Sequence, residues 1–305
     1  ENHIKNDKPD IFHGQHCWIS TSILTDYDIP VVCTIHGTDL MGYEKAKDLL
    51  SNPNISIEDA KKYNFYIKSA EKAARNSKRI FVISKQQEEK FKKLFPFAAD
   101  KVVLVRNGCD TTVFYKDNSV DAKAILSTLS SNISPAGIPT NYDKLAIFVG
   151  KFAQFKRVDL VLDAAKIYEE EMLKKGLNVL TLIVGAGALD EDLKKHQAEL
   201  NLHNTHFIGR QDANTVRSLQ NISDVFLAPS DNEPDGLVYK ECMLCNNIPV
   251  GTLGGGVPDT LNPNNDELTA IPGTEIYPTP YGVLIPMNNS KALADAAMYV
   301  MNNPD

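Results

Sequence analysis

The chain has 305 residues, of which 43% are hydrophobic and 23% charged, and its formal net charge is −7. This composition indicates a globular protein with room for two domains, and it excludes a disordered chain or general affinity for nucleic acid. No apolar run has the length of a membrane span, and five scattered cysteines favour a reducing compartment over a disulfide framework. We therefore expect a cytoplasmic protein with no nucleic-acid partner.

Short apolar segments ending in Gly, Ser or Asn alternate with helical patterns along the chain. The predicted strands are Asp10–His13, Pro30–His36, Arg79–Ser84, Lys101–Arg106, Leu145–Gly150, Val179–Gly185, Thr205–Gly209, Asp224–Ser230, Ile248–Thr252 and Gly282–Pro286. Such strands are typical of parallel sheets covered on both faces, so the sequence predicts an α/β protein. One predicted helix begins at Ser84, an N-cap residue, and another spans Val158–Leu173. The buried stripe of the former comprises Phe91, Leu94 and Phe95.

The segment 118–143 is rich in Ser, Asn, Pro and Thr and has no sustained period. We interpret it as the linker between two α/β domains, residues 1–140 and 141–305. Each domain is expected to be a doubly wound parallel sheet, which binds ligands at the carboxyl ends of its strands. Most candidate motifs follow strands of the second half, so that half is expected to hold the larger ligand.

The segment Glu233–Glu241 follows a predicted strand and places a glycine, Gly236, between two carboxylates at the start of a helix. Free N–H groups and the helix dipole favour a phosphate at such a position. Glu241 falls about one turn into the helix, where its carboxylate can accept hydrogen bonds from sugar or ribose hydroxyls. Two alternatives stay open: helix starts generally favour acidic residues, and paired carboxylates occur in glycosidases, although Glu241 should point toward its own strand's ligand.

Two lysines, Lys151 and Lys156, flank the turn after the strand Leu145–Gly150. Their ammonium groups could neutralise a diphosphate without a metal, or they could be ordinary solvated lysines. The turn Gly185–Gly187 could border a nucleotide, but Asp190 replaces the third glycine of a dinucleotide fingerprint. The run Gly254–Gly256 could offer N–H groups to phosphate or sugar oxygens, or could be a flexible loop.

A histidine, His36, ends the strand Pro30–His36 and is followed by Gly37, which allows close approach of a ligand. Its imidazole could bind a substrate hydroxyl or donate to a leaving phosphate; a structural role is the alternative. The pair His13 and His16 has metal-like spacing, but no fixed geometry and no accompanying carboxylate cluster, so no metal site is expected.

Two further patterns have plain interpretations. Cys242 and Cys245 form a C-x-x-C beside Glu241 without a second pair, so we expect packing residues. The predicted helix Lys61–Lys78 is rich in lysine although the protein is acidic. Its basic face is either solvated or makes a peripheral contact with an anionic membrane or acceptor.

Taken in order along the chain, these motifs resemble the retaining GT-B glycosyltransferases known as glycosyl transferases group 1, of the family 4 type. The matching segments are Pro30–Asp39, Phe81–Ser84, Asn107–Asp110 with Phe114, Val149–Arg157, Leu182–Gly187, Phe207–Gly209, Asp224–Glu241, Gly255–Asp259 and Gly282–Pro286. The resemblance covers essentially the whole chain. It implies two Rossmann-like domains facing across a cleft, the first on the acceptor side and the second binding a nucleotide-diphosphate sugar.

The resemblance also implies roles for single residues. The implied donor-binding residues are Lys151, Lys156, Gly209, Arg210, Gly236, Leu237, Val238 and Glu241, and the implied catalytic residues are His36 and Glu233. The lysines would hold the diphosphate, Glu241 the ribose hydroxyls, and Glu233 would lie near the transferred sugar. Transfer would retain anomeric configuration and need neither metal nor cofactor. The expected donor is a UDP-sugar, and the acceptor, whether glycan, glycolipid, protein or small molecule, stays open.

Three departures from the family pattern bear on these expectations. Lys151 stands where the family usually has Arg, and Asp235 places a negative charge beside the proposed phosphate site. The family's first strand with its Gly-rich loop is expected before Glu1 and its closing helix after Asp305, so the chain is expected to bind a donor yet transfer poorly. A GT-B epimerase of sugar nucleotides and a catalytically degenerate partner subunit are the rival interpretations.

Overall fold

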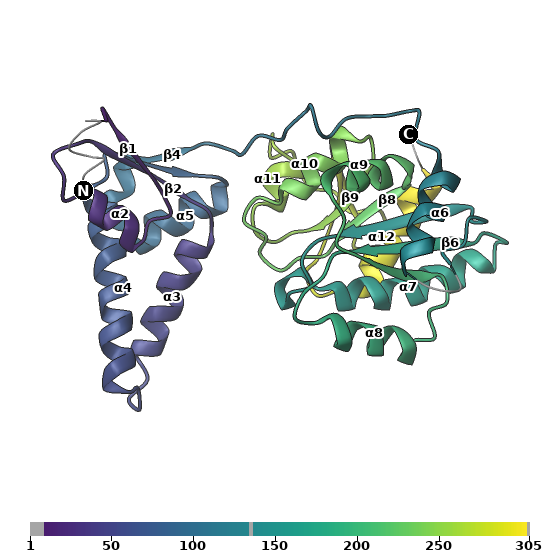
Figure 1. Cartoon of the computed structure of the whole chain (residues 1–305), viewed down its shortest axis with the longest axis horizontal. Helices are drawn as coiled ribbons and strands as arrows, with labels where there is room; N and C mark the ends of the chain where they lie inside the picture. The colour runs from purple at the N-terminus through teal and green to yellow at the C-terminus, as the bar shows by residue number, and fades with distance from the viewer. Residues whose placement is uncertain (1–8, 134–136, 304–305) are drawn as a thin grey trace. The chain divides into compact units, whose positions relative to one another are not determined.

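The computed structural model describes residues 9–133 and 137–303 (Figure 1). The chain divides into two compact units, residues 1–107 and 108–305, so the second unit begins before the predicted boundary at residue 141. Each unit contains a mainly parallel sheet with helices packed against it. The predicted α/β class is therefore confirmed.

The first unit has a four-stranded parallel sheet in the order β1-β2-β3-β4. Its elements are β1 (Phe12–Gln15), α2 (Ile19–Leu24), β2 (Val31–Ile35), α3 (Thr38–Leu50), α4 (Ile57–Asn76), β3 (Arg79–Val82), α5 (Lys85–Leu94), the 3₁₀ helix η1 (Pro96–Lys101) and β4 (Val102–Leu104). The hydroxyl of Ser84 caps α5 by accepting from the Gln87 N–H, as predicted. Phe91 and Phe95 are fully buried in the core of this unit, with Leu94 packed against it.

The second unit has a seven-stranded sheet in the order β10-β11-β9-β8-β5-β6-β7, parallel except for the pair β10–β11. Its elements are α6 (Ala122–Ile133), β5 (Lys144–Val149), the 3₁₀ helix η2 (Gln154–Lys156), α7 (Val158–Leu173), β6 (Val179–Val184), α8 (Asp190–Glu199), β7 (Thr205–Gly209), α9 (Ala213–Ile222), β8 (Val225–Ala228), α10 (Leu237–Leu244), β9 (Ile248–Thr252), α11 (Val257–Leu261), β10 (Tyr277–Thr279), β11 (Gly282–Ile285) and α12 (Ser290–Asn302). All ten predicted strands are present, and β10 is an addition.

Helices cover both faces of this larger sheet. On one face, α7 and α12 pack together over a core that includes Tyr168 and Leu293 (Figure 1). On the other face, α6, α9, α10 and α11 cover a second core that includes Leu219 and Tyr239. Every residue of β6 is buried, because a strand covered on both faces has no solvent side.

The segment 118–143, which the sequence predicts as the linker between the two domains, contains the helix α6 within the second unit. Leu126 is fully buried and Leu129 nearly so, and both belong to the core of the second unit. The apolar residues Ile125, Leu126 and Leu129 occupy only one face of a short helix, and the surrounding Ser and Asn residues obscure that pattern. The formation of α6 therefore depends on packing against the core of the second unit rather than on the helix propensity of its own residues.

Candidate functional site

The strand order of the second unit reverses between β5 and β8. The chain runs outward from β5 to β6 and β7, then returns to β8 on the other side of β5. In doubly wound sheets, ligands bind beyond the carboxyl ends of the strands at such a reversal, because the following loops diverge there. The loops after β5 and β8 are those that carry Lys156 and Glu233.

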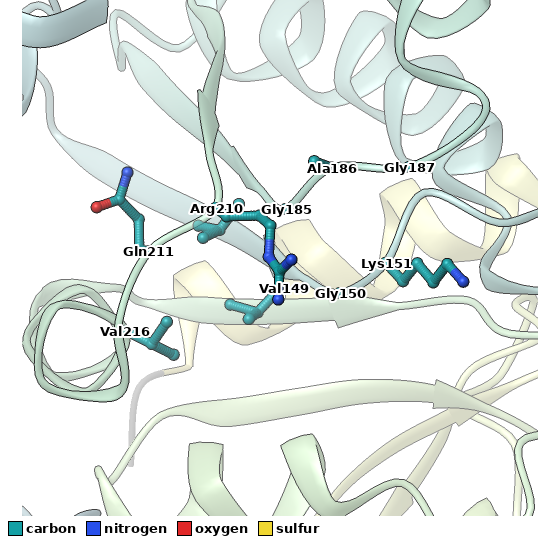
Figure 2. A pocket seen from close by; sticks show the side chains of 10 residues that line it. Val149, Gly150, Lys151, Gly185, Ala186, Gly187, Arg210, Gln211 and Val216 are labelled. Carbon is teal, nitrogen blue, oxygen red and sulfur yellow. The ribbon is translucent and has the colours of Figure 1, made fainter.

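A pocket of about 610 Å³ lies at the carboxyl ends of β5, β6 and β7 (Figure 2). Its lining consists of Val149, Gly150, Lys151, Val184, Gly185, Ala186, Gly187, Arg210, Gln211 and Val216. This volume is within the range of small-molecule sites. Two predicted donor-binding residues, Lys151 and Arg210, line this pocket, and Gly209 ends the adjoining strand. Lys151 forms no ion pair with any carboxylate of residues 9–133 or 137–303, so its positive charge is uncompensated.

Glycines let the loops after β5 and β6 approach one another at the wall of this pocket. A Cβ on Gly185 would lie 1.8 Å from the carbonyl oxygen of Gly150, and one on Gly187 would lie 2.2 Å from that of Phe152. The Phe152 N–H also donates to the Ala186 carbonyl, at 3.0 Å. The backbone contact therefore requires glycine at positions 185 and 187, as is common where a chain passes close to a ligand.

Lys156 and Glu233 form an ion pair across the reversal of strand order. Their side chains are only 16% and 12% exposed. Neither residue lines the pocket of Figure 2. The sequence predicts that Lys156 binds a diphosphate and that Glu233 lies near the sugar. In the structure, the charges of these two residues compensate each other.

A second ion pair, which the sequence analysis missed, joins the same two loops. The Arg157 guanidinium binds both carboxylate oxygens of Asp159, at 2.8 to 3.2 Å, and lies 3.6 Å from Asp231. The Asp231 N–H donates to the Phe155 carbonyl, at 2.7 Å. Arg157 has a φ of 50°, a left-handed conformation that turns the chain into α7. The only available signal was the Arg-x-Asp spacing at a helix start.

A glycine shapes the start of α10. Gly236 has a φ of 69°, and a Cβ there would lie 2.4 Å from the ring of Tyr239. That ring cannot move aside easily, because the Tyr239 hydroxyl donates to the buried Ala228 carbonyl, at 2.6 Å. Leu237 and Val238 are the first residues of α10, so their N–H groups belong to the first turn, which has no intrahelical acceptors.

Asp235 does not add free negative charge to this helix start. Its side chain is buried and lies 2.6 Å from the Lys240 ammonium. The Thr260 hydroxyl donates to the Asp235 carbonyl, at 3.2 Å. The expected conflict between Asp235 and a phosphate is therefore relieved within the protein, because Lys240 supplies the opposite charge.

Glu241 lies in the middle of α10, partly buried and outside the lining of the pocket. Burial raises the pKa of its carboxyl above the ordinary value. Burial, and secondarily the nearby Glu241, likewise raise the pKa of the Cys109 thiol. Cys242 and Cys245 are free and buried in the core, which confirms that they are packing residues.

The glycine run after β9 contacts the backbone of Glu233. The Gly256 N–H donates to the Glu233 carbonyl, at 2.7 Å, and a Cβ on Gly255 would lie 2.1 Å from the same oxygen. The Gly256 N–H, one of the groups predicted to bind a ligand, therefore donates to the protein's own backbone instead. The run positions the Glu233 loop.

In the first unit, His36 follows β2 and its Nε2 lies 2.7 Å from Oε1 of Gln15. Partial burial, and then the neighbouring His16, lower the pKa of His36, which favours the neutral imidazole. The buried Asp39 carboxylate accepts from the N–H groups of His36, at 2.9 Å, and Cys17, at 2.8 Å, and lies 3.1 Å from Nδ1 of His16. Sequence reasoning missed Asp39, whose signal is an acidic residue in the first helical turn after a strand.

His13 Nε2 lies 2.7 Å from the Thr34 hydroxyl. Within the part of the chain that the structure describes, no group of three or more His, Cys, Asp or Glu residues could hold a metal ion. None of the helices in that part combines the length and apolarity needed to cross a bilayer.

Two family models together match most of the chain. The model described as "Glycosyl transferases group 1" matches residues 132–305, and the model described as "Glycosyltransferase Family 4" matches residues 1–113. An α-maltose-1-phosphate synthase from Mycobacterium tuberculosis is 25% identical over 244 residues, covering 77% of this chain and 56% of that protein. The chain thus spans little more than half the length of this curated relative.

Solved structures confirm the fold. Sucrose-phosphate synthase from Thermosynechococcus elongatus has a TM-score of 0.70 at 18% identity, covering 99% of this chain and 67% of its own. Anabaena Alr3699/HepE in complex with UDP-glucose has a TM-score of 0.62 at 17% identity, covering 97% and 72% respectively. The fold is therefore GT-B, with two Rossmann-like domains.

Proposed function

Since the chain belongs to the glycosyl transferases group 1 family, we propose that it moves a sugar from a nucleotide-diphosphate sugar, a UDP-sugar, to an acceptor hydroxyl. In this proposal the anomeric configuration is retained and no metal or cofactor takes part. The observation that carries it is the pocket beside the strand reversal, where Lys151 and Arg210 bring positive charge to a glycine-walled site. The HepE structure, which contains UDP-glucose, supports the choice of donor.

The proposed donor extends from this pocket toward α10. The base would occupy the pocket, and the ribose would lie between the pocket and α10, where Glu241 would accept from its hydroxyls. The diphosphate would lie near Lys151 and the N–H groups of Leu237 and Val238, where the helix dipole favours negative charge. Lys156 would divide its hydrogen bonds between the diphosphate and Glu233, leaving that carboxylate to orient the sugar.

The transfer step follows from this arrangement. The acceptor hydroxyl would attack the anomeric carbon on the face from which the diphosphate leaves. The bond from that carbon to the phosphate oxygen breaks, and the departing oxygen accepts the hydroxyl proton. The positive charges and helix N–H groups would stabilise the negative charge that develops on the leaving group. The neutral imidazole of His36, whose Nε2–H is directed at Oε1 of Gln15, would accept a hydrogen bond from a donor-sugar hydroxyl at Nδ1.

Thermal shift with UDP, GDP and ADP tests the donor site. At a hundredfold excess over Kd, a bound nucleotide stabilises the fold by about 2.7 kcal/mol, which raises Tm by roughly 5–10 °C. We expect this shift with UDP and its loss in Glu241→Ala. Glu191→Ala, which removes an exposed carboxylate of the same unit, is the matched control. No shift with any nucleotide on folded protein would contradict the donor site and favour a degenerate subunit.

Product analysis separates transfer from epimerisation. We expect slow release of the sugar from its UDP conjugate in the absence of acceptor, with the anomeric configuration kept in the first product. An isomerised sugar nucleotide in place of free UDP would identify an epimerase instead.

A further inference from the structure

One side of α4 in the first unit exposes apolar and basic side chains together. Ile57, Lys61, Asn64, Phe65 and Lys68 recur at helical spacing and line one shallow surface hollow. Ile57 is 77% exposed and Phe65 is 59% exposed. The hydrophobic core therefore does not account for these two large apolar side chains.

The opposite side of α4 does contribute to the core. Ala70, Ala73 and Ala74 are buried against the sheet of the first unit. Toward its N-terminus the helix packs beside α3, with which it forms a hairpin (Figure 1). The exposed side thus belongs to a helix that is already held in place, and it can bind a surface without unfolding.

The charges on this side are predominantly basic. Lys61 and Lys68 form no ion pair with any carboxylate that the structure describes. Of the acidic residues nearby, Glu58 lies at the edge of the exposed side, and Glu71 points to α3, where its carboxylate accepts from the Tyr43 hydroxyl at 2.8 Å. A locally positive surface therefore stands on a protein whose net charge is −7.

We propose that this side of α4, from Ile57 to Lys68, binds the surface of an anionic lipid bilayer. Ile57 and Phe65 enter the boundary between headgroups and acyl chains, and the Lys61 and Lys68 ammonium groups reach the lipid phosphates. A merely solvated face would explain the lysines but not the two exposed apolar side chains. A protein partner fits less well, because lysine is depleted in protein–protein interfaces. The proposal is independent of the proposed transfer reaction.

The expected binding is weak and reversible. Each lysine near an anionic surface strengthens binding about fivefold at low salt, so Lys61 and Lys68 together contribute about 25-fold. Screening by added salt removes most of this contribution. Inserting one aromatic side chain adds about a further tenfold.

Sedimentation of the full chain with lipid vesicles tests the proposal. We expect binding to vesicles of phosphatidylcholine with phosphatidylglycerol, and little binding to phosphatidylcholine alone. Lys61→Gln/Lys68→Gln should weaken binding about 25-fold and Phe65→Ser about tenfold. The matched control is Lys92→Gln/Lys93→Gln on α5, which removes the same charge from two exposed lysines of the same unit. Circular dichroism and thermal melts establish that each variant is folded.

Three results would overturn the proposal. The first is no binding to the anionic vesicles by the folded wild-type chain. The second is an equal loss of binding in the α4 and α5 lysine variants, which would indicate non-specific attraction. The third is unchanged binding by Phe65→Ser, which would exclude insertion of the aromatic side chain.

Discussion

Lys156 and Glu233 are 77 positions apart in the sequence and form an ion pair across the reversal of strand order. The pair joins the loop after β5 to the loop after β8, and both side chains are largely buried. A residue expected to bind phosphate and a residue expected to bind sugar therefore hold each other in position. The same contact contributes to stability and to the geometry of the proposed donor site.

Removing one partner of this pair should destabilise the second unit. Lys156→Met leaves the Glu233 carboxylate buried without its cation, which we expect to cost about 3 kcal/mol in the free energy of unfolding. Lys156→Met/Glu233→Gln should recover most of that loss, because neither position then carries an unpaired charge. Urea unfolding measures both. Lys174→Met, at an exposed pair with Glu171, is the control and should change little. A double variant as unstable as Lys156→Met alone would refute the coupling.

Two glycines with nearly the same positive φ should respond differently to alanine. Gly209 has a φ of 68° with nothing within 4 Å of an added Cβ, so Gly209→Ala should cost about 1 kcal/mol for backbone strain alone. Gly236 has a φ of 69°, but an added Cβ meets the Tyr239 ring at 2.4 Å. Gly236→Ala should therefore cost about 2 kcal/mol more than Gly209→Ala. Chemical denaturation compares them, and equal losses would show that Tyr239 yields without cost.

Glu169 should make stability depend on pH. Its carboxyl accepts from the Thr205 hydroxyl at 2.9 Å, and burial raises its pKa from 4.5 to about 7. The native state therefore holds a proton that the unfolded state loses, and this stabilisation is full below pH 4.5 and disappears as pH rises through about 7. Glu169→Gln, which is always neutral, should gain about 2 kcal/mol over wild type at pH 8 and almost nothing at pH 4.

Melting curves across this pH range measure the difference between Glu169→Gln and wild type. Glu191→Gln changes an exposed carboxylate of the same unit and is the control. A gain for Glu169→Gln that is equal at both ends of the range would rule out titration of this carboxyl as its cause.

Glu241 should show opposed effects on stability and binding. Burial raises the pKa of its carboxyl, so ionisation of this carboxyl disfavours the native state. Glu241→Gln should raise Tm at pH 7 by roughly 1–2 °C, a small gain because solvent partly screens the site, and the gain should vanish at acidic pH. If the carboxylate binds ribose, the same variant should lose most of the UDP-induced shift. A lower Tm without nucleotide would show that Glu241 supports the fold instead.

The strands and the positions of the site loops were predictable from the sequence because both follow from local pattern. Continuous apolar runs such as Val179–Val184 are strands buried on both faces, and the chain leaves each strand at its carboxyl end. Residues just after the strands, including Lys151 and Arg210, consequently gather in one pocket. The edge strand β10 was missed because it has three residues with a central Pro278. The helix α6 was missed because it is stabilised by packing against the core of the second unit, which the local sequence does not show.

The sequence by itself determined that this is an α/β chain of the glycosyltransferase group 1 pattern, with Gly236 and its flanking carboxylates at a helix start. Only the tertiary structure decided which charges meet. Lys156 pairs with Glu233, Asp235 with Lys240, and Arg157 reaches Asp231. The two contacts made by Lys156 and Arg157 depend on β8 lying next to β5, an order that local spacing does not encode. Burial also raises the Glu241 pKa through its surroundings in the folded unit, because desolvation comes from atoms distant in the sequence.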